Sequence, residues 1–132
     1  MKGLIFYRCT DCGNIVLIVE GSGVTPHCCG KPMIPLNVNT NDFSAEKHIP
    51  VVTVRGRETE IRVGSVEHPM TESHHLEWIL LVTDRRMYTE FIDIGNEPIV
   101  RFITDSSETP TAAYTFCNLH GLWLKRLDEA EH

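Results

Sequence analysis

The segment Thr59-Glu60-Ile61-Arg62-Val63 carries the pattern that decides the fold class. Its apolar and β-branched residues alternate with charged ones, so Thr59, Ile61 and Val63 would share one face of an extended strand. Similar segments bounded by turn residues surround it, and no stretch sustains the 3.6-residue periodicity of a helix. About seven short strands spaced by turns predict an all-β chain built on an antiparallel β-sandwich. Besides 59–63, the expected strands lie at 48–54, 76–83, 87–92, 99–104 and 112–116.

The first 36 residues form a separate and smaller part of the chain. Short β-like runs at 4–8 and 14–20 precede the turn Gly21-Ser22-Gly23. So small a piece cannot fold by its apolar core alone and needs a staple such as a metal ion. Residues 37–45, Asn-Val-Asn-Thr-Asn-Asp-Phe-Ser-Ala, are polar and turn-prone and are interpreted as a linker. The predicted division is a domain at 1–36, a linker at 37–45, a sandwich domain at 46–127 and a tail at 128–132.

Composition and charge exclude several classes of protein. The sequence is 42% hydrophobic and 23% charged, as is normal for a globular chain. The net charge of −6 argues against a general nucleic-acid binder, which would carry a basic face. The longest apolar runs have five residues, whereas a membrane-spanning helix needs about 20. Because the start of the chain lacks the apolar stretch and cleavage site of a signal peptide, a cytoplasmic location without membrane contact is expected.

Four of the five cysteines lie within the first 29 residues. Cys9 and Cys12 form a C-x-x-C knuckle that lets both sulfur atoms face one ion, and Cys28 and Cys29 would complete a four-sulfur site. The Cα atoms of adjacent cysteines lie only about 3.8 Å apart, so the backbone must twist and the tetrahedron is expected to be distorted. Disulfides are the alternative, but an odd number of cysteines without a secretion signal fits them poorly. Iron and zinc both suit four sulfur ligands, and spacing leaves that choice open.

The second candidate site combines histidines with the fifth cysteine. His68 and His74 lie six residues apart, Cys117 and His120 lie three apart, and His48 begins the expected strand at 48–54. These residues sit at the ends of predicted strands, where loops of one end of a sandwich can converge. A single scattered histidine would carry little weight as a ligand. The remaining histidines are predicted not to be ligands: His27, His75 and His132.

At this point the chain resembles the desulfoferrodoxin family of two-iron superoxide reductases over almost its whole length. The resemblance rests on six motifs in the same order, which together are far more specific than any one of them. They are Cys9-Thr10-Asp11-Cys12-Gly13-Asn14, Cys28-Cys29-Gly30-Lys31-Pro32-Met33, Glu46-Lys47-His48-Ile49-Pro50, Val63-Gly64 through His68-Pro69-Met70, Glu77-Trp78-Ile79 and Cys117-Asn118-Leu119-His120-Gly121-Leu122-Trp123.

The resemblance implies two iron centres. The four cysteines would hold a rubredoxin-like iron in a small desulforedoxin-like domain, although zinc is possible there. A second, catalytic iron would sit on an immunoglobulin-like sandwich, with an open sixth position at which superoxide is reduced to hydrogen peroxide. Such proteins are homodimers, and a rubredoxin or similar small redox protein is the expected electron donor. The implied ligands of the second iron are His48, His68, His74 and His120 as equatorial ligands and Cys117 as the axial ligand.

The resemblance also assigns roles to Glu46 and Lys47. Lys47 would draw in the superoxide anion and stabilise charge at the open position, and Glu46 would be the sixth ligand of the oxidised iron. Two alternatives remain from the residues alone. One is a rubredoxin-like electron carrier whose second site is only structural, and the other is a zinc-stapled binding module. The chain departs from the family pattern at His75, where an aromatic residue is common, and in the charged tail that begins at Lys125.

Overall fold

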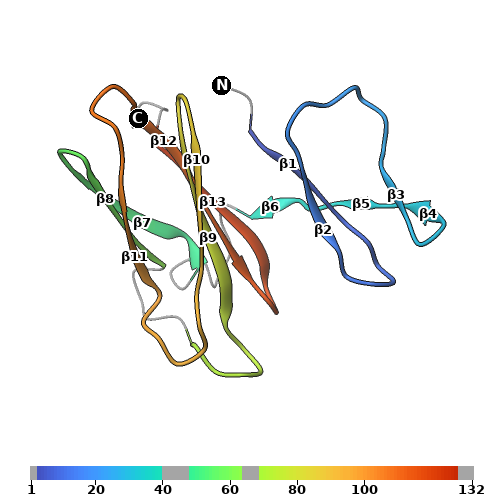
Figure 1. Ribbon diagram of the computed structural model, residues 1–132. Coiled ribbons are helices and arrows are strands. Elements are labelled where there is room, and N and C mark those ends of the chain that lie inside the picture. Colours follow the sequence, from blue (N-terminus) through green and yellow to red (C-terminus); the bar gives the residue numbers. More distant parts are fainter. Residues whose placement is uncertain (1–2, 40–47, 64–68, 128–132) are drawn as a thin grey trace. The chain divides into compact units, whose positions relative to one another are not determined.

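The computed structural model describes residues 3–39, 48–63 and 69–127 and is built from β-strands (Figure 1). The all-β class predicted from the alternating pattern is confirmed. The chain divides into two compact units, Met1–Asn37 and Val38–His132. Within the described residues, no helix combines the length and the hydropathy needed to cross a membrane.

The first unit consists of two small antiparallel sheets. Its buried hydrophobic residues in the described part are Phe6, Cys9 and Met33, a very small core. This agrees with the expectation that the unit needs a staple, because so little apolar surface cannot offset the loss of chain entropy. One sheet has the order β2-β1-β5 and the other pairs β3 with β4, with the bounds β1 Ile5–Arg8, β2 Ile15–Ile18, β3 His27–Cys28, β4 Lys31–Pro32 and β5 Ile34–Pro35.

The second unit is a sandwich of a five-stranded and a three-stranded sheet (Figure 1). The first sheet has the order β10-β9-β12-β13-β6 and the second has the order β11-β8-β7. All pairs are antiparallel except that of β13 with β6. The bounds are β6 Val38–Asn39, β7 Pro50–Arg55, β8 Glu58–Val63, β9 Leu76–Thr83, β10 Met87–Phe91, β11 Ile99–Ile103, β12 Pro110–Cys117 and β13 Gly121–Arg126.

The core lies between these two sheets. Thr59, Ile61 and Val63 of β8 are all fully buried, so the face predicted from the alternating segment is confirmed. The main cluster takes residues from both sheets, and burial of this apolar surface is the dominant stabilising contribution. Its members are Ile61, Val63, Leu76, Ile79, Leu81, Val100, Phe102, Ala113 and Cys117.

Strand β12 is buried on both of its faces, unlike the alternating strand β8. Ala113, Thr115 and Cys117 point to one face, and Tyr114 and Phe116 point to the other, with every one of them buried. The sequence of such a strand is a nearly continuous run of buried residues and does not alternate between buried and exposed ones. The predicted segment 112–116 is therefore shorter than the strand, which runs to Cys117 and carries this cysteine into the core.

Part of the predicted linker is a strand. Val38 and Asn39 form β6, which pairs in parallel with Leu122 and Trp123 of β13. Residues 40–45 of that segment lie outside the described residues. A two-residue strand whose partner is more than 80 positions away leaves no local pattern, because its hydrogen bonds are made with another part of the chain.

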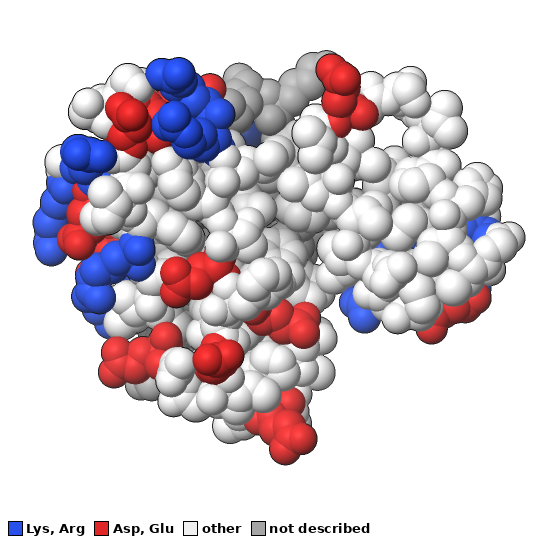
Figure 2. Space-filling view, viewed as in Figure 1, with Lys and Arg blue, Asp and Glu red and all other residues white. Residues whose placement is uncertain are grey.

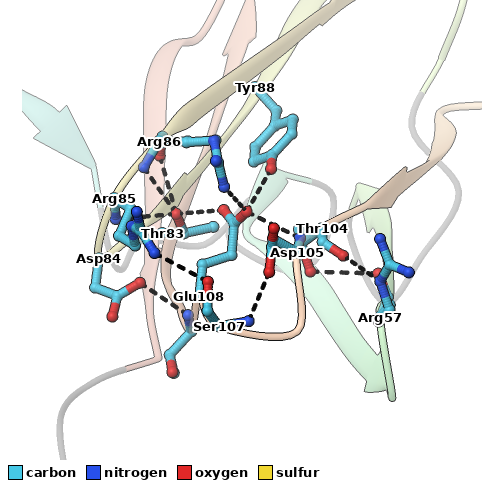
Figure 3. Close-up of polar contacts among 11 residues, drawn as sticks. Arg57, Thr83, Asp84, Arg85, Arg86, Tyr88, Thr104, Asp105, Ser107 and Glu108 are labelled. Atoms are coloured by element: carbon cyan, nitrogen blue, oxygen red, sulfur yellow. Dashed lines mark hydrogen bonds and ion pairs between the residues drawn. The ribbon is translucent and has the colours of Figure 1, made fainter.

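One turn region of the sandwich is organised around the buried carboxylate of Glu108 (Figure 3). The Thr83 hydroxyl donates to it at 2.6 Å, and the Tyr88 hydroxyl donates at 2.8 Å. The Asp105 N–H donates at 2.9 Å, and the Arg86 guanidinium forms an ion pair with it. Burial by itself raises the pKa of Glu108, but the donors outweigh it and lower the pKa to about 2. The carboxylate therefore stays charged and ties β9, β10 and the loop before β12 together.

Charge is unevenly distributed over the face shown in Figure 2. Basic side chains gather along one side of the larger unit with acidic ones between them, and the charged side chains visible over the lower part of that unit are acidic. In the three-stranded sheet, Arg101 of β11 forms a cross-strand ion pair with Glu60 of β8 at 3.1 Å. An acidic chain of net charge −6 therefore has to rely on local positive charge to attract an anion.

Candidate metal centres

The first candidate centre begins at the turn that follows β1. The N–H of Gly13 donates to the carbonyl of Cys9 at 3.0 Å, and the N–H of Cys9 donates to the carbonyl of Asn14 at 2.9 Å. Gly13 has a φ of 81°, a left-handed conformation that glycine adopts without steric cost. This tight turn brings Cys9 and Cys12 back toward each other, as the C-x-x-C spacing predicts.

The adjacent cysteines lie at a two-residue hairpin turn between β3 and β4. Cys29 and Gly30 occupy its central positions with φ values of 55° and 76°, the pattern of a type I′ turn. Cys29 has the only positive φ found among the described residues that are not glycine. The predicted backbone twist is thus present, and it lets two consecutive side chains face the same point.

The four sulfur atoms of Cys9, Cys12, Cys28 and Cys29 lie within 4.8 Å of one another. The Cys12–Cys28 and Cys28–Cys29 sulfur distances are 3.6 Å and 3.9 Å. Four sulfur atoms bound tetrahedrally at about 2.3 Å from a metal lie about 3.8 Å apart, whereas disulfide sulfurs are separated by about 2 Å. All four cysteines are free thiols, so the arrangement fits a metal ion and not a pair of disulfides.

The crowding of the four thiols and their hydrogen bonds shift the thiol pKa values in opposite directions. The Cys12 side chain is the main cause that raises the pKa of Cys28 to about 12, since crowded thiols disfavour a second negative charge. A hydrogen bond from the backbone N–H of Cys12 is the main cause that lowers the pKa of Cys9 to about 6. The cluster without metal therefore retains protons, and a bound cation would displace them.

The second candidate centre brings together side chains from four places in the sandwich. His48 precedes β7, His74 lies in the turn before β9, Cys117 ends β12, and His120 lies in the turn between β12 and β13. One donor atom from each of them lies within 4.8 Å of the others. The convergence of strand ends expected from the sequence is therefore present for these four residues.

The distances within this group suit ligands of one ion. Nε2 of His48 lies 3.1 Å from Nδ1 of His120, close to the separation of about 3 Å between two nitrogen ligands at a right angle around a metal. Sγ of Cys117 lies 3.9 Å from Nδ1 of His120. The ring of His120 is roughly perpendicular to those of His48 and His74, with centroids 4.8 Å and 4.9 Å away. Three imidazoles and a thiol facing one point are a donor set that suits iron or zinc.

Burial separates the inner and outer sides of this site. His48 and Cys117 are fully buried, His74 is half-buried, and His120 is exposed. Burial raises the pKa of the Cys117 thiol, and the backbone N–H groups of Leu119 and His120 act in the opposite direction. A cation bound beside Cys117 would favour the thiolate, and the site reaches the protein surface at His120.

Residues around the site hold the imidazoles in place. The indole of Trp123 stacks on His48 with ring centroids 4.7 Å apart and an interplanar angle of 14°. Its Nε1–H donates to the carbonyl of His120 at 3.2 Å, so one buried side chain contacts both histidines. The Thr115 hydroxyl donates to the carbonyl of His48 at 3.0 Å, and Nδ2 of Asn39 donates to the carbonyl of His120 at 3.3 Å. Sequence reasoning included Trp123 only as the end of a motif and missed Thr115 and Asn39, whose contacts no local pattern reveals.

Eight of the predicted site residues form two clusters in the structure. The structure brings together the four cysteines of the first centre and the four residues His48, His74, Cys117 and His120 of the second. Neither group includes His27 or His75, which were predicted not to be ligands. Nδ1 of His75 instead lies 2.9 Å from the carbonyl of Thr71. The other predicted site residues lie outside the described residues: Glu46, Lys47 and His68.

Comparison with protein families gives matches over both units. The family described as "Desulfoferrodoxin" matches residues 40–126, and the one described as "Desulfoferrodoxin, N-terminal domain" matches residues 3–36. Among curated proteins, a desulfoferrodoxin homolog of Archaeoglobus fulgidus is 41% identical over 117 residues, covering 89% of this chain and 92% of its own. The desulfoferrodoxin of Nitratidesulfovibrio vulgaris is 40% identical over 117 residues, with 89% and 91% of the two chains covered.

Solved structures show the same similarity. The superoxide reductase from Treponema pallidum superimposes with a TM-score of 0.79 at 32% identity, covering 94% of this chain and 98% of that one. A one-iron superoxide reductase from Giardia intestinalis superimposes with a TM-score of 0.55 at 31% identity, covering 64% of this chain and 99% of that one. The similarity thus extends to a shorter protein that matches only part of this chain.

Proposed function

Because the chain belongs to the desulfoferrodoxin family, we propose that it is a superoxide reductase, an enzyme that converts superoxide to hydrogen peroxide. The observation that supports this most directly is the convergence of three imidazoles and one thiol in the sandwich unit. A bound iron ion would supply the one-electron couple there, so that superoxide, one electron and two protons give one hydrogen peroxide. No oxygen is released in this reaction, which distinguishes it from dismutation.

The residues of the site would have different roles. His48, His74 and His120, together with His68, are the proposed imidazole ligands, and Cys117 is the proposed thiolate ligand. A buried thiolate donates electron density to a metal, as in thiolate-ligated haem. Trp123 and Thr115 fix the buried His48, so that the ligands need little rearrangement during turnover. The exposed side at His120 is where a diatomic anion would enter.

Lys47 and Glu46 complete the proposal. Lys47 is the cation proposed to attract superoxide and to stabilise charge as the oxygen species becomes more negative. Local positive charge is needed here because the protein as a whole carries a net charge of −6 and would repel an anion. Glu46 is proposed as a removable ligand of the oxidised iron. Both residues lie outside the described residues and come to this proposal from the family motif alone.

The stoichiometry of the reaction tests the function. The protein is purified anaerobically, its metals are measured, and superoxide is delivered in pulses with and without a reductant. A superoxide reductase forms one peroxide per superoxide and requires electrons. One peroxide and one oxygen per two superoxides, without a donor, would instead establish a dismutase. An absence of rapid reaction would favour an electron carrier whose second site is only structural.

The role of Lys47 is tested separately by Lys47→Ala. The variant should capture superoxide more slowly and with a weaker dependence on salt, while its visible absorption stays unchanged, because the charge is lost without loss of a ligand. Lys31→Ala is the matched control, since Lys31 forms an exposed ion pair with Asp11 in the other unit and its removal changes the net charge equally. Equal rates and equal salt dependence in wild type and Lys47→Ala would exclude the proposed steering.

The cofactors and assembly follow from the same family membership. We propose iron in both centres, with the cysteine-only centre in the domain at 1–36 and the catalytic centre in the sandwich at 46–127. Zinc would fit the four cysteines equally well by geometry. The electron donor is proposed to be a rubredoxin or similar small redox protein, and the protein is proposed to be a cytoplasmic homodimer. Metal analysis distinguishes iron from zinc, and sedimentation equilibrium measures the oligomeric state.

A further inference from the structure

Asn118 lies directly after Cys117 and is hydrogen-bonded to the segment that carries His74. Its backbone N–H donates to the carbonyl of His75 at 3.1 Å. Its side-chain Oδ1 accepts from the N–H of His75 at 2.8 Å, and its Nδ2 donates to the carbonyl of Ser73 at 3.1 Å. The two residues that flank His74 are therefore both held by one side chain.

The local strand geometry explains why an asparagine is suited to this position. The pairing of β12 with β9 shifts register between Phe116 and Cys117, so that Cys117 faces Leu76. In a continued ladder, the N–H of His75 would bond to a backbone carbonyl on the opposite strand. The chain turns away after Cys117 instead, and Oδ1 of Asn118 takes the place of that carbonyl. The amide nitrogen of the same side chain then reaches Ser73.

His74 is held from its other side by Thr71. The N–H of Thr71 donates to the carbonyl of His74 at 2.9 Å, and the N–H of His74 donates back to the carbonyl of Thr71 at 3.2 Å. These bonds shape the turn itself but do not connect it to β12. The side chain of Asn118 provides a hydrogen-bonded link between the segment that carries His74 and the segment that carries Cys117 and His120.

We propose that Asn118 is a positioning residue that sets the distance of His74 from Cys117 and His120 and thereby completes the donor set of the second centre. It acts through the backbone on both sides of His74, by way of His75 and Ser73. An aspartate would keep the acceptor for His75 but would place a carboxylate oxygen against the carbonyl of Ser73. Both halves of the amide are therefore needed. The inference rests on the proposed function only in taking this cluster as a metal site.

The test measures how tightly iron is held, not how fast superoxide reacts. Ferric protein is titrated with a competing iron chelator, and each centre is followed by its own thiolate-to-iron absorption, because the two ligand sets differ. The cysteine-only centre serves as an internal reference within the same chain. Asn118→Ala should weaken iron binding at the second centre by about 10- to 100-fold, the usual effect of removing a partner that orients a ligand. Asn96→Ala, an exposed asparagine in the same unit, is the matched control and should change neither centre.

A double-mutant cycle decides whether Asn118 acts through His74. In a His74→Ala background, Asn118→Ala should add less than about a threefold further loss, because the ligand that it positions is already absent. The same 10- to 100-fold loss in both backgrounds, or no loss in the single variant, would overturn the proposal. If Asn118→Ala fails to give a folded protein by circular dichroism, Asn118→Asp takes its place in the same cycle. A chain that passes this test but does not reduce superoxide would refute the proposed function and leave the positioning role of Asn118 intact.

Discussion

Replacement of Trp123 by phenylalanine should destabilise the sandwich and loosen the second centre together. Trp123 is 1% exposed, stacks on His48 and donates its Nε1–H to the carbonyl of His120 at 3.2 Å. Trp123→Phe keeps an aromatic ring at the position but removes the donor and part of the ring area. The perturbation therefore affects two proposed ligands without altering either of them.

The expected magnitude follows from the two losses. A missing hydrogen bond to a carbonyl costs about 1 kcal/mol here, at the low end, because Asn39 still donates to the carbonyl of His120. An indole carries about two more ring carbons than a phenyl ring, and their loss from a buried site costs about 1.5 kcal/mol, with a further term for the cavity. The free energy of unfolding of the metal-free protein should therefore fall by about 2–3 kcal/mol.

Urea unfolding of metal-free protein, followed by circular dichroism, measures this change. Trp78→Phe is the matched control, since Trp78 stacks on Phe116 in the same unit but is only half-buried. It should cost about 1 kcal/mol, because a partly exposed site can relax toward solvent. Iron release from the second centre should accelerate in Trp123→Phe and remain unchanged in Trp78→Phe. Equal losses of stability in both variants, with equal iron release, would refute the argument that Trp123 supports the site.

Three further predictions test other parts of the molecule. Cys117→Ser should abolish the thiolate absorption of the second centre and weaken its iron binding, and an unchanged visible spectrum would contradict the assignment of this ligand. Cys28→Ser should empty the cysteine-only centre and destabilise the first unit, while the initial reaction with superoxide persists; loss of that reaction would mean that both centres are needed. Glu108→Gln should be less stable than wild type at neutral pH, with a difference that shrinks as the pH falls from about 4.5 to about 2. The sign follows because the folded pKa is lowered, so this stabilisation exists above the ordinary pKa and is lost on acidification. Urea unfolding as a function of pH measures it, with the exposed Glu90→Gln as control, and a constant difference across that range would contradict the role of the charge.

Much of the fold is visible in local sequence patterns. The strand at 76–83 has the predicted bounds, and the predicted face of β8 is buried. Five strands were not predicted: the two-residue strands β3, β4 and β5 of the first unit, β6, which lies in the segment interpreted as a linker, and β13, which lies in a segment considered only for its motif. The pairing of β6 with β13 depends on hydrogen bonds between distant segments. Such bonds leave no periodicity in either segment, because every residue except proline offers the same backbone donor and acceptor whichever strand it pairs with.

The candidate site divides in the same way. Residue type and spacing indicate which side chains could bind a metal, since sulfur and imidazole at short intervals are rare except where a ligand set is needed. Spacing does not indicate which supporting residues hold them. Asn39, Thr115 and Asn118 are polar residues of ordinary appearance, and their contacts with the backbone of the site exist only after the strands have paired.

By itself, the sequence determined the all-β class, the division into a small cysteine-rich part and a larger part, and the eight candidate donor side chains that the structure brings together. These properties reside in residue type, in alternation and in short intervals, all of which act over a few residues. Only the tertiary structure decided that His48 and His120, 72 positions apart, bring their ring nitrogens to 3.1 Å. It also decided that Trp123 and Asn118 hold that arrangement. The physical reason is that packing and strand pairing between distant segments set these distances, and a linear pattern does not contain them.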